Sequence, residues 1–237
     1  MKKKMIFAQL VFLSLFAGMF TLLNGQRRMT DTGIDLLHYL ESNHNYISNY
    51  HEQQSTIAGS PYMDRDFVTS EAIFSQKRFV DLKIRFNYYE GCFEFRENDQ
   101  LSSLCPGECK LDTVWMEDRT FVFVNYLAGE KVAQAFMQLL SSSPTRVLLH
   151  QRMIIEEGTP AQAYKDPSPA RFKKVQPEFY IIQNGEAAAK RFKGKGSVKE
   201  LFPEHQSELL DYSKKKKLKL KKQQDIITLC QFYDSLP

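Results

Sequence analysis

The 237-residue sequence lacks the short motifs that mark the common enzyme and cofactor sites. It contains no G-x-S-x-G segment, which excludes the nucleophile turn of an α/β-hydrolase. It contains neither G-x-x-x-x-G-K-[ST] nor G-x-G-x-x-G, which excludes a P-loop and the usual dinucleotide-binding turn. Only five histidines are present, and none belongs to the H-E-x-x-H pair of a zinc protease. The sequence therefore predicts no catalytic residue, no metal site and no cofactor.

Cysteine is scarce, with Cys92, Cys105, Cys109 and Cys230 as its four members. No C-x-x-C pair occurs and no histidine lies close by, which argues against a zinc or redox site. In an exported chain, however, a disulfide can form among Cys92, Cys105 and Cys109. Cys105 reaches Cys109 across a Pro-Gly turn, Cys92 on a neighbouring strand is an equally suitable partner, and buried free thiols are the alternative. Cys230 is expected to be a small core residue on a helix.

Only one long apolar run is present, at residues 5–23. Lys2, Lys3 and Lys4 precede it, and Asn24, Gly25 and Gln26 follow it. This order is typical of a secretory signal peptide, so we expect residues 1–25 to be removed and the protein to reach the periplasm or cell envelope. A run of 19 residues also approaches the roughly 20 that span a bilayer. An uncleaved anchor is therefore the alternative, favoured by the basic pair Arg27-Arg28. No cysteine lies near residue 25, which argues against a bacterial lipoprotein.

The formal net charge of +4 is distributed unevenly along the chain. The leader lysines contribute +3 of it, and residues 27–170 hold 14 basic and 20 acidic side chains. Residues 171–222 hold 15 basic and 6 acidic side chains. The mature chain is therefore close to neutral but has a strongly basic C-terminal part, which favours contact with an anionic partner.

The strongest compositional feature is a lysine run made of Lys214, Lys215, Lys216, Lys217, Lys219, Lys221 and Lys222. Export argues against nucleic acid as the partner, and the run lacks the interleaved aromatic residues that single-strand binding prefers. An anionic lipid, a glycan or an envelope protein is therefore the expected partner, with the protein soluble or peripheral to a membrane after signal cleavage. The alternative is a solvated helix face that only keeps the protein soluble.

Alternating apolar and polar residues predict strands over the middle of the chain, in a β-rich domain of residues 61–183. Val80, Leu82 and Ile84 begin one such strand, and the turn at Glu90-Gly91 connects it to a partner at residues 92–96 as a hairpin. Further strands are expected at residues 111–116, 120–126, 135–140, 147–155 and 178–183. Residues 158–177 carry four prolines and are interpreted as a linker or a loop lying against the sheet.

The flanking regions are a polar segment at residues 26–60 and a basic helical segment at residues 184–237. In the latter, Ser197 and Glu200 fit a capping box, Pro203 suits the start of the next helix, and apolar spacing over residues 226–233 predicts a last helix. The predicted fold class is α+β: an antiparallel β-meander, as a sheet or half-barrel, with a C-terminal pair of short helices.

Several segments resemble a group of exported proteins from Bacteroidota-type bacteria. They are Gly59-Ser60-Pro61-Tyr62, KIRFNYY at residues 83–89, FEF at residues 93–95 and LKLKKQQDII at residues 218–227. That group has no established activity, so the resemblance implies an envelope location and supplies no site residues. The turn from Cys105 to Cys109 is not a feature of the group.

These observations favour an exported, envelope-associated binding or structural protein over an enzyme. One alternative is an exported hydrolase whose site is assembled from residues distant in sequence, which short motifs do not reveal. Another is a lipid carrier, in which the aromatic inner face of a half-barrel holds an apolar molecule.

Overall fold

The structure of the protein is a computed structural model, and it describes residues 57–64, 66–97, 100–107, 111–160 and 166–237, together with Leu36 and Ser48–Asn49. The predicted signal segment, most of the polar segment 26–60, and Cys109 lie outside the described residues.

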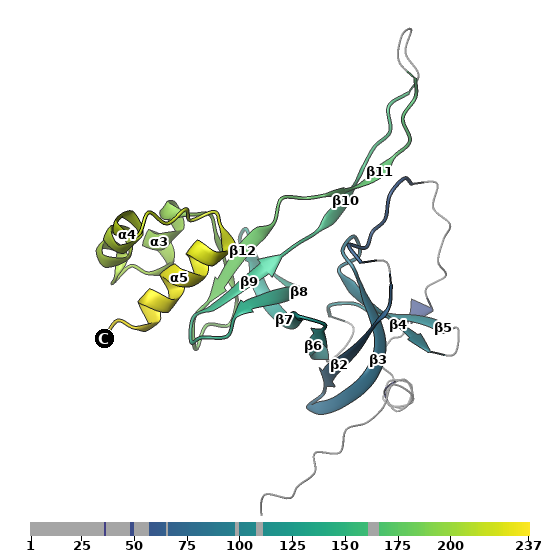
Figure 1. Cartoon of the computed structure of the whole chain (residues 1–237), viewed down its shortest axis with the longest axis horizontal. Coiled ribbons are helices and arrows are strands. Elements are labelled where there is room, and N and C mark those ends of the chain that lie inside the picture. Colours follow the sequence, from purple (N-terminus) through teal and green to yellow (C-terminus); the bar gives the residue numbers. More distant parts are fainter. Residues whose placement is uncertain are drawn as a thin grey trace, which may run out of the picture. The chain divides into compact units, whose positions relative to one another are not determined.

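Within the described residues, eleven strands form one antiparallel sheet and two more pair as a separate ribbon (Figure 1). The order across the sheet is β1-β5-β4-β3-β2-β6-β7-β8-β9-β12-β13. Its strands are β1 (Ser48–Asn49), β2 (Val68–Phe74), β3 (Lys77–Asn87), β4 (Cys92–Glu97), β5 (Gln100–Leu104), β6 (Leu111–Met116), β7 (Arg119–Ala128), β8 (Lys131–Ser141), β9 (Arg146–His150), β12 (Glu178–Ile182) and β13 (Lys190–Phe192). The ribbon consists of β10 (Met153–Glu156) and β11 (Arg171–Lys174).

The sheet is built from two meanders that meet where β2 pairs with β6. Strands β2 to β5 are neighbours in chain order on one side of this seam, and β6 to β9 are neighbours on the other. The predicted hairpin at residues 80–96 is confirmed, with Ile84 opposite Phe95 and Phe86 opposite Phe93. Together with the C-terminal helices, this confirms the α+β antiparallel meander.

Most differences from the predicted pattern are short strands. The sequence analysis gives no separate strand for β2, which has seven residues, or for β5, β11 and β13, which have five, four and three. The expected strand 147–155 is two strands, because β9 ends at His150 and β10 begins at Met153. The interpretation of residues 158–177 as a linker or surface loop is wrong at β11, which pairs with β10 in a ribbon that extends away from the sheet (Figure 1).

A phenylalanine-rich core fills the space between β2, β3, β4, β6, β7 and β8. The ring centroid of Phe93 lies 4.8 Å from that of Phe86, 5.5 Å from that of Phe121 and 5.0 Å from that of Phe136. Tilted and edge-to-face rings at such distances stabilise a core beyond the area they bury. The high phenylalanine content of the sequence is therefore explained by packing.

Three helices follow the last strand: α3 (Lys195–Leu201), α4 (Gln206–Lys215) and α5 (Gln223–Asp234). They share a second apolar cluster with β9, β12 and β13, in which Phe202, Leu209 and Leu229 are almost completely buried. The predicted final helix is confirmed as α5, and the helical turn expected at Ser197–Glu200 lies within the short helix α3. Among the described residues, no helix combines the length and apolar character needed to cross a membrane.

The predicted start signals of the first two helices are wrong. The α3 helix begins two residues before Ser197, directly after Gly194, whose φ of 102° favours glycine. The Ser197 hydroxyl accepts a hydrogen bond from the Lys193 N–H at 2.9 Å, so it does not cap the helix from outside. The α4 helix begins at Gln206, three residues after Pro203. The chain between α3 and α4 is a turn rather than a direct helix start.

Candidate functional site

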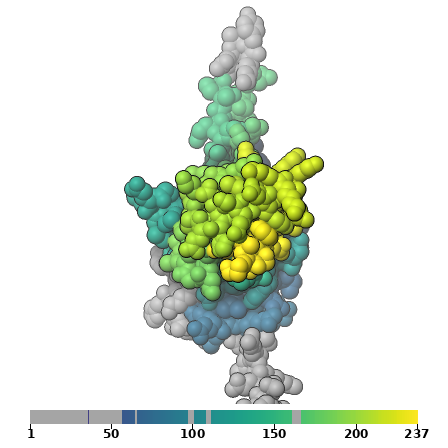
Figure 2. Space-filling view, turned by 90° about the vertical axis from the view of Figure 1, so that its left-hand side faces the viewer, coloured from purple at the N-terminus to yellow at the C-terminus, as the bar shows by residue number. Residues whose placement is uncertain are grey.

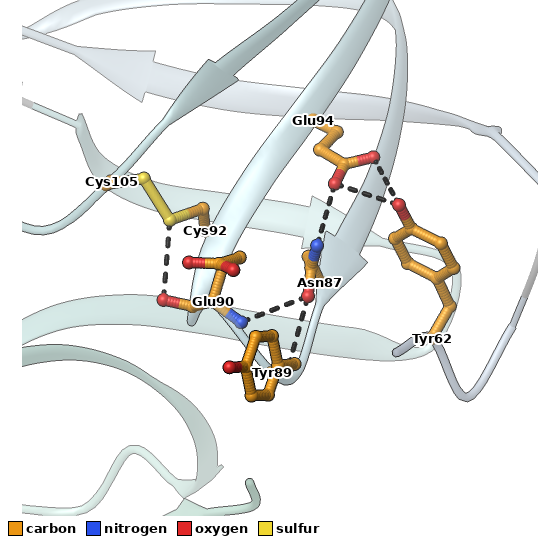
Figure 3. The surroundings of a disulfide bond; sticks show 7 residues. All are labelled: Tyr62, Asn87, Tyr89, Glu90, Cys92, Glu94 and Cys105. Atoms are coloured by element: carbon orange, nitrogen blue, oxygen red, sulfur yellow. Dashed lines mark hydrogen bonds between the residues drawn. A yellow bond between two sulfur atoms is a disulfide. The ribbon is translucent and has the colours of Figure 1, made fainter. Parts of the chain in front are cut away.

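A disulfide joins Cys92, the first residue of β4, to Cys105, the residue after β5 (Figure 3). The register of the two strands brings these residues together, because Phe93 lies opposite Leu104. This is one of the two pairings that the sequence left open. The bond leaves neither sulfur as a thiol for metal binding or nucleophilic attack. Burial raises the pKa of the remaining described cysteine, Cys230, to about 12, so this thiol stays protonated and unreactive.

A buried ion pair lies on the same hairpin, between Arg85 of β3 and Glu94 of β4. The Arg85 Nε donates to a Glu94 carboxylate oxygen at 2.7 Å, and Asn87 donates to the other oxygen at 2.9 Å. The Tyr62 hydroxyl adds a contact to the Glu94 carboxylate at 3.0 Å (Figure 3). The Tyr62 ring lies under the Arg85 guanidinium at 3.9 Å. Since both carboxylate oxygens have partners, we assign this cluster to stabilising the hairpin and not to chemistry.

The predicted lysine run lies at the end of α4 and in the connection to α5, and all seven lysines are exposed. Figure 2 looks onto these helices, whose yellow-green and yellow residues form the surface nearest the viewer. Only Lys214 forms an ion pair with a described residue, the equally exposed Asp211 at 3.0 Å. Such a pair contributes little in solvent.

The fold also brings a second group of basic residues to the lysine run. A Cβ built on Gly194 would lie 3.5 Å from the backbone oxygen of Leu220, so the loop carrying the run passes close to the start of α3. Lys193 and Lys195 flank Gly194 and are exposed. Residues 190–222 hold 12 basic and 4 acidic side chains. Positive charges from two parts of the chain thus form one surface, which we call the basic face.

Beside the basic face, the sheet curls so that the chain entering β13 returns to β7. The Ala189 N–H donates to the Asn125 carbonyl at 2.8 Å, and its own carbonyl accepts from the Leu127 N–H at 2.9 Å. Alternate residues of β7, β8, β9 and β12 form a third apolar cluster inside the curl. Its buried members are Val122, Val124, Ala135, Met137, Leu148, Tyr180, Ile182 and Ala189.

A pocket of about 590 Å³ adjoins this cluster, bordered by the ends of β7 and β9, the start of β12, β13 and α3. Three rings form its wall: the ring centroids of Tyr126 and Tyr180 are 5.2 Å apart, and that of His150 lies 5.4 Å from Tyr126 and 6.0 Å from Tyr180. Each ring continues an inward-facing row of its strand, since Tyr126 comes two residues after Val124 and His150 two residues after Leu148.

His150 is 9% exposed, and its Nδ1 is buried without a hydrogen-bond partner among the described residues. Burial, assisted by the nearby positive charge of Arg152, lowers the pKa of His150 to about 4. The imidazole is therefore neutral at physiological pH. In either neutral tautomer, Nδ1 remains a buried polar atom without a protein partner among the described residues.

A carboxylate between two guanidinium groups forms the rim of the pocket. Glu178, directly opposite His150 in the strand register, is 14% exposed at its side chain. It pairs with Arg191 at 2.7 Å and with Arg152 at 3.4 Å. The Tyr180 hydroxyl donates to it at 3.4 Å, and burial raises the pKa of that phenol to about 12. The rim therefore carries an excess of positive charge and a protonated phenol.

The residues of this pocket are not predicted by the sequence analysis, which found only the lysine run and the cysteine cluster. His150 and Glu178 are distant in the chain, and they meet only because β12 pairs with β9. The alternation of Glu178, Tyr180 and Ile182 on one face of a predicted strand was the available signal. Within the described residues, no group of three or more histidine, cysteine, aspartate or glutamate side chains is arranged to hold a metal ion.

Comparison with known protein families, with curated proteins and with solved structures gives no match for this chain. The resemblance to exported Bacteroidota-type proteins therefore stays a prediction. The case for a function depends on the basic face and the pocket.

Proposed function

We propose that the protein is exported to the periplasm or cell envelope, where it binds an anionic lipid surface through the basic face. The observation that carries the proposal is the exposure of all seven lysines of the run beside Lys193 and Lys195. A lysine close to an anionic membrane contributes about 1 kcal/mol to binding. Several such lysines on one face are therefore sufficient for peripheral attachment.

The surroundings of the lysine run favour a surface contact over insertion into the bilayer. The large apolar side chains that are exposed among the described residues are Met63, Tyr89, Val132 and Ile154, and none of them belongs to the helices. The apolar residues of α4 and α5 face the sheet, where Leu209, Ile226 and Leu229 are buried. The attraction is therefore electrostatic, and salt should weaken it.

The disulfide supports the export part of the proposal. Disulfides persist in oxidising compartments and are rare in the cytoplasm, where thiols are kept reduced. The Cys92–Cys105 bond joins two adjacent strand ends in a well-packed hairpin. An oxidising periplasm or envelope is consistent with this bond and with the predicted signal peptide.

The two alternative functions have less support from the same residues. A hydrolase needs an activated nucleophile or a paired acid and base. Among the described residues, the buried Nδ1 of His150 has no serine or carboxylate partner. A lipid carrier needs an empty apolar interior, whereas the inside of the curl is filled by side chains such as Met137 and Leu148.

Sedimentation with lipid vesicles tests the proposal. The wild-type protein should sediment with vesicles that contain phosphatidylglycerol and stay in solution with pure phosphatidylcholine. Changing lysines 214–217 to glutamine should weaken the apparent affinity at least about ten-fold, because four charges near the surface are lost. Raising the salt concentration to about 0.5 M should release the wild type.

A matched control is available on the strands. Lys83, Lys131, Lys173 and Lys174 are also exposed, and changing them to glutamine removes the same amount of charge from elsewhere. This control should bind like the wild type. An equal loss of vesicle binding in both variants would show that only the net charge of the protein matters, which would contradict the proposal. Binding to an acidic glycan or an envelope protein, with no binding to anionic vesicles, would replace the lipid as the partner.

A further inference from the structure

The pocket beside the basic face combines three kinds of surface. Its inner side adjoins the apolar cluster inside the curl, its wall consists of three rings, and its rim is charged. Small-molecule sites in proteins combine apolar and aromatic surface with polar groups that fix the orientation of the ligand, and in this pocket the polar share is the larger one. The volume of about 590 Å³ also lies within the range of such sites.

The polar groups of the pocket are mainly donors. Arg152, Lys190, Arg191 and Lys193 border it, against two carboxylates, Glu178 and Glu200. Glu178 lies between Arg152 and Arg191, so its charge is balanced before any ligand enters. The surplus of cations favours a ligand with negatively charged oxygen atoms, which arginine binds in a paired geometry.

His150 contributes a second, independent observation to the pocket. It is more than nine-tenths buried, and its Nδ1 has no partner among the described residues, which is an unfavourable arrangement for a polar side chain in a core. Stabilisation of the fold does not explain such a histidine, whereas a place in the aromatic wall of a binding site, against Tyr126 and Tyr180, does.

The aromatic wall defines the other half of the ligand. Tyr126 and Tyr180 meet edge to face, with an angle of 78° between the rings, and His150 meets Tyr126 at 68°. Faces and edges arranged in this way accept a flat apolar group better than an extended chain, because aromatic groups pack by offset stacking or edge contacts. The ring of the ligand would lie against the tyrosines and its anionic group at the arginine rim.

We infer that this pocket binds a small anionic molecule that carries a carboxylate or phosphate on a flat apolar ring, with Arg152 and Arg191 holding the anion and Tyr126, His150 and Tyr180 holding the ring. The inference does not depend on the proposed membrane attachment, because different side chains carry it. Lysines 214–217 are not among the residues that border the pocket.

Nuclear magnetic resonance titration of the full mature chain with phenyl phosphate tests the inference. Phenyl phosphate should shift signals of Tyr126, His150 and Tyr180 in a saturable manner. Inorganic phosphate (the anion alone) and benzyl alcohol (the ring alone) should each bind at least about ten-fold more weakly. Benzylamine, with the opposite charge, should not compete. Equal binding of inorganic phosphate, or shifts confined to the lysine run, would overturn the inference.

Variants at the rim separate this site from general electrostatics. The double change Arg152→Gln and Arg191→Gln should weaken phenyl phosphate binding at least about ten-fold, because two charge-assisted contacts are lost. Both side chains are about half exposed, at 48% and 45%, so the fold should tolerate the change. Arg78→Gln is the control, since Arg78 is 43% exposed and is also paired with a glutamate. Similar losses in the double variant and the control would overturn the inference.

The lysine 214–217 variant keeps the two proposals distinguishable. It should bind phenyl phosphate like the wild type, and the arginine double variant should sediment with anionic vesicles like the wild type. Loss of both activities in both variants would show that one diffuse positive field, and not a built pocket, attracts the anion. A circular dichroism spectrum and a thermal unfolding curve for each variant confirm that the fold is intact.

Discussion

At the scale of single residues, His150 is the clearest case of a side chain that the fold itself does not require. Its Nδ1 is buried without a partner among the described residues, and burial lowers its pKa to about 4. Arg152 reinforces that lowering and Glu178 opposes it, while Tyr126 and Tyr180 supply uncharged neighbours. A phenylalanine would fill this aromatic position without an unsatisfied polar atom, so we expect the histidine to lower stability here.

The change His150→Phe tests that argument through the pH dependence of stability. The folded-state pKa lies below the ordinary value of 6.5, so the folded wild type loses stability as the pH falls from about 6.5 toward 4. The loss should approach about 3 kcal/mol, because one pKa unit corresponds to about 1.4 kcal/mol. Urea unfolding at pH 7 and pH 4.5 should show the difference between variant and wild type growing in favour of the variant at the lower pH.

Carboxylates that titrate in the same window cancel in that difference, since both proteins contain them. At pH 7 the variant should be at least as stable as the wild type, yet bind phenyl phosphate more weakly. A variant that is less stable at both pH values would mean that His150 has a structural role. A difference that does not change with pH would contradict the lowered pKa.

At the scale of secondary-structure elements, alternation was informative where a strand is long and has one buried face. The β3–β4 hairpin was predicted because β3 has eleven residues and a Glu-Gly turn follows it. Alternation did not reveal β11 and β13, which have four and three residues. Each pairs with another short strand, β11 with β10 and β13 with β12. The predicted helix starts were wrong for a related reason. Serine is a common N-cap residue, but Ser197 lies inside α3, whose Val198 and Leu201 pack in the same apolar cluster as the sheet.

The candidate site likewise has parts that the sequence predicts and parts that only the fold reveals. The lysine run is local in sequence, so composition was enough to find it. Its proximity to Lys193 and Lys195 could be seen only from the fold, which brings Leu220 close to Gly194. The pocket is entirely a product of strand pairing. The disulfide is an intermediate case. The sequence allowed Cys105 to pair with Cys92 or with Cys109, and the register of β4 with β5 selects Cys92.

The disulfide offers a test at the level of the hairpin. Changing Cys92 and Cys105 together to serine should lower the free energy of unfolding by about 3 kcal/mol, as expected for a closed loop with a sequence separation of 13. Guanidinium unfolding with and without dithiothreitol measures it: the reductant should destabilise the wild type and leave the double variant unchanged. A wild type that is insensitive to reductant after full unfolding and refolding in it would contradict the bond.

At the scale of the whole molecule, charge is arranged in order along the chain: a basic and apolar N-terminal segment, predicted to be a leader, then an acidic middle and a basic C-terminal part. If the leader is removed, the +3 that it contributes is removed with it, and the mature chain is close to neutral. The basic face belongs to the last third of the chain, and the pocket is formed by that third together with the strands that pair with it. Binding to anionic surfaces would consequently depend on the basic C-terminal part of the chain and not on the net charge of the whole protein.

Processing of the leader is the prediction on which this view of the whole molecule depends. Expression of the full chain in a Gram-negative host should yield a periplasmic protein whose N-terminus lies close to residue 26, because a basic start, an apolar run and small residues at 24–26 form a signal peptide. Mass spectrometry of the protein released by osmotic shock measures the N-terminus directly. Changing Leu13 and Leu15 to arginine should stop export by interrupting the apolar run, and serves as the control. A chain that begins at Met1 and stays in the membrane fraction at high salt would establish the uncleaved anchor. Attachment through the basic face would then act only in addition to that anchor, and its lysine variants would no longer release the protein.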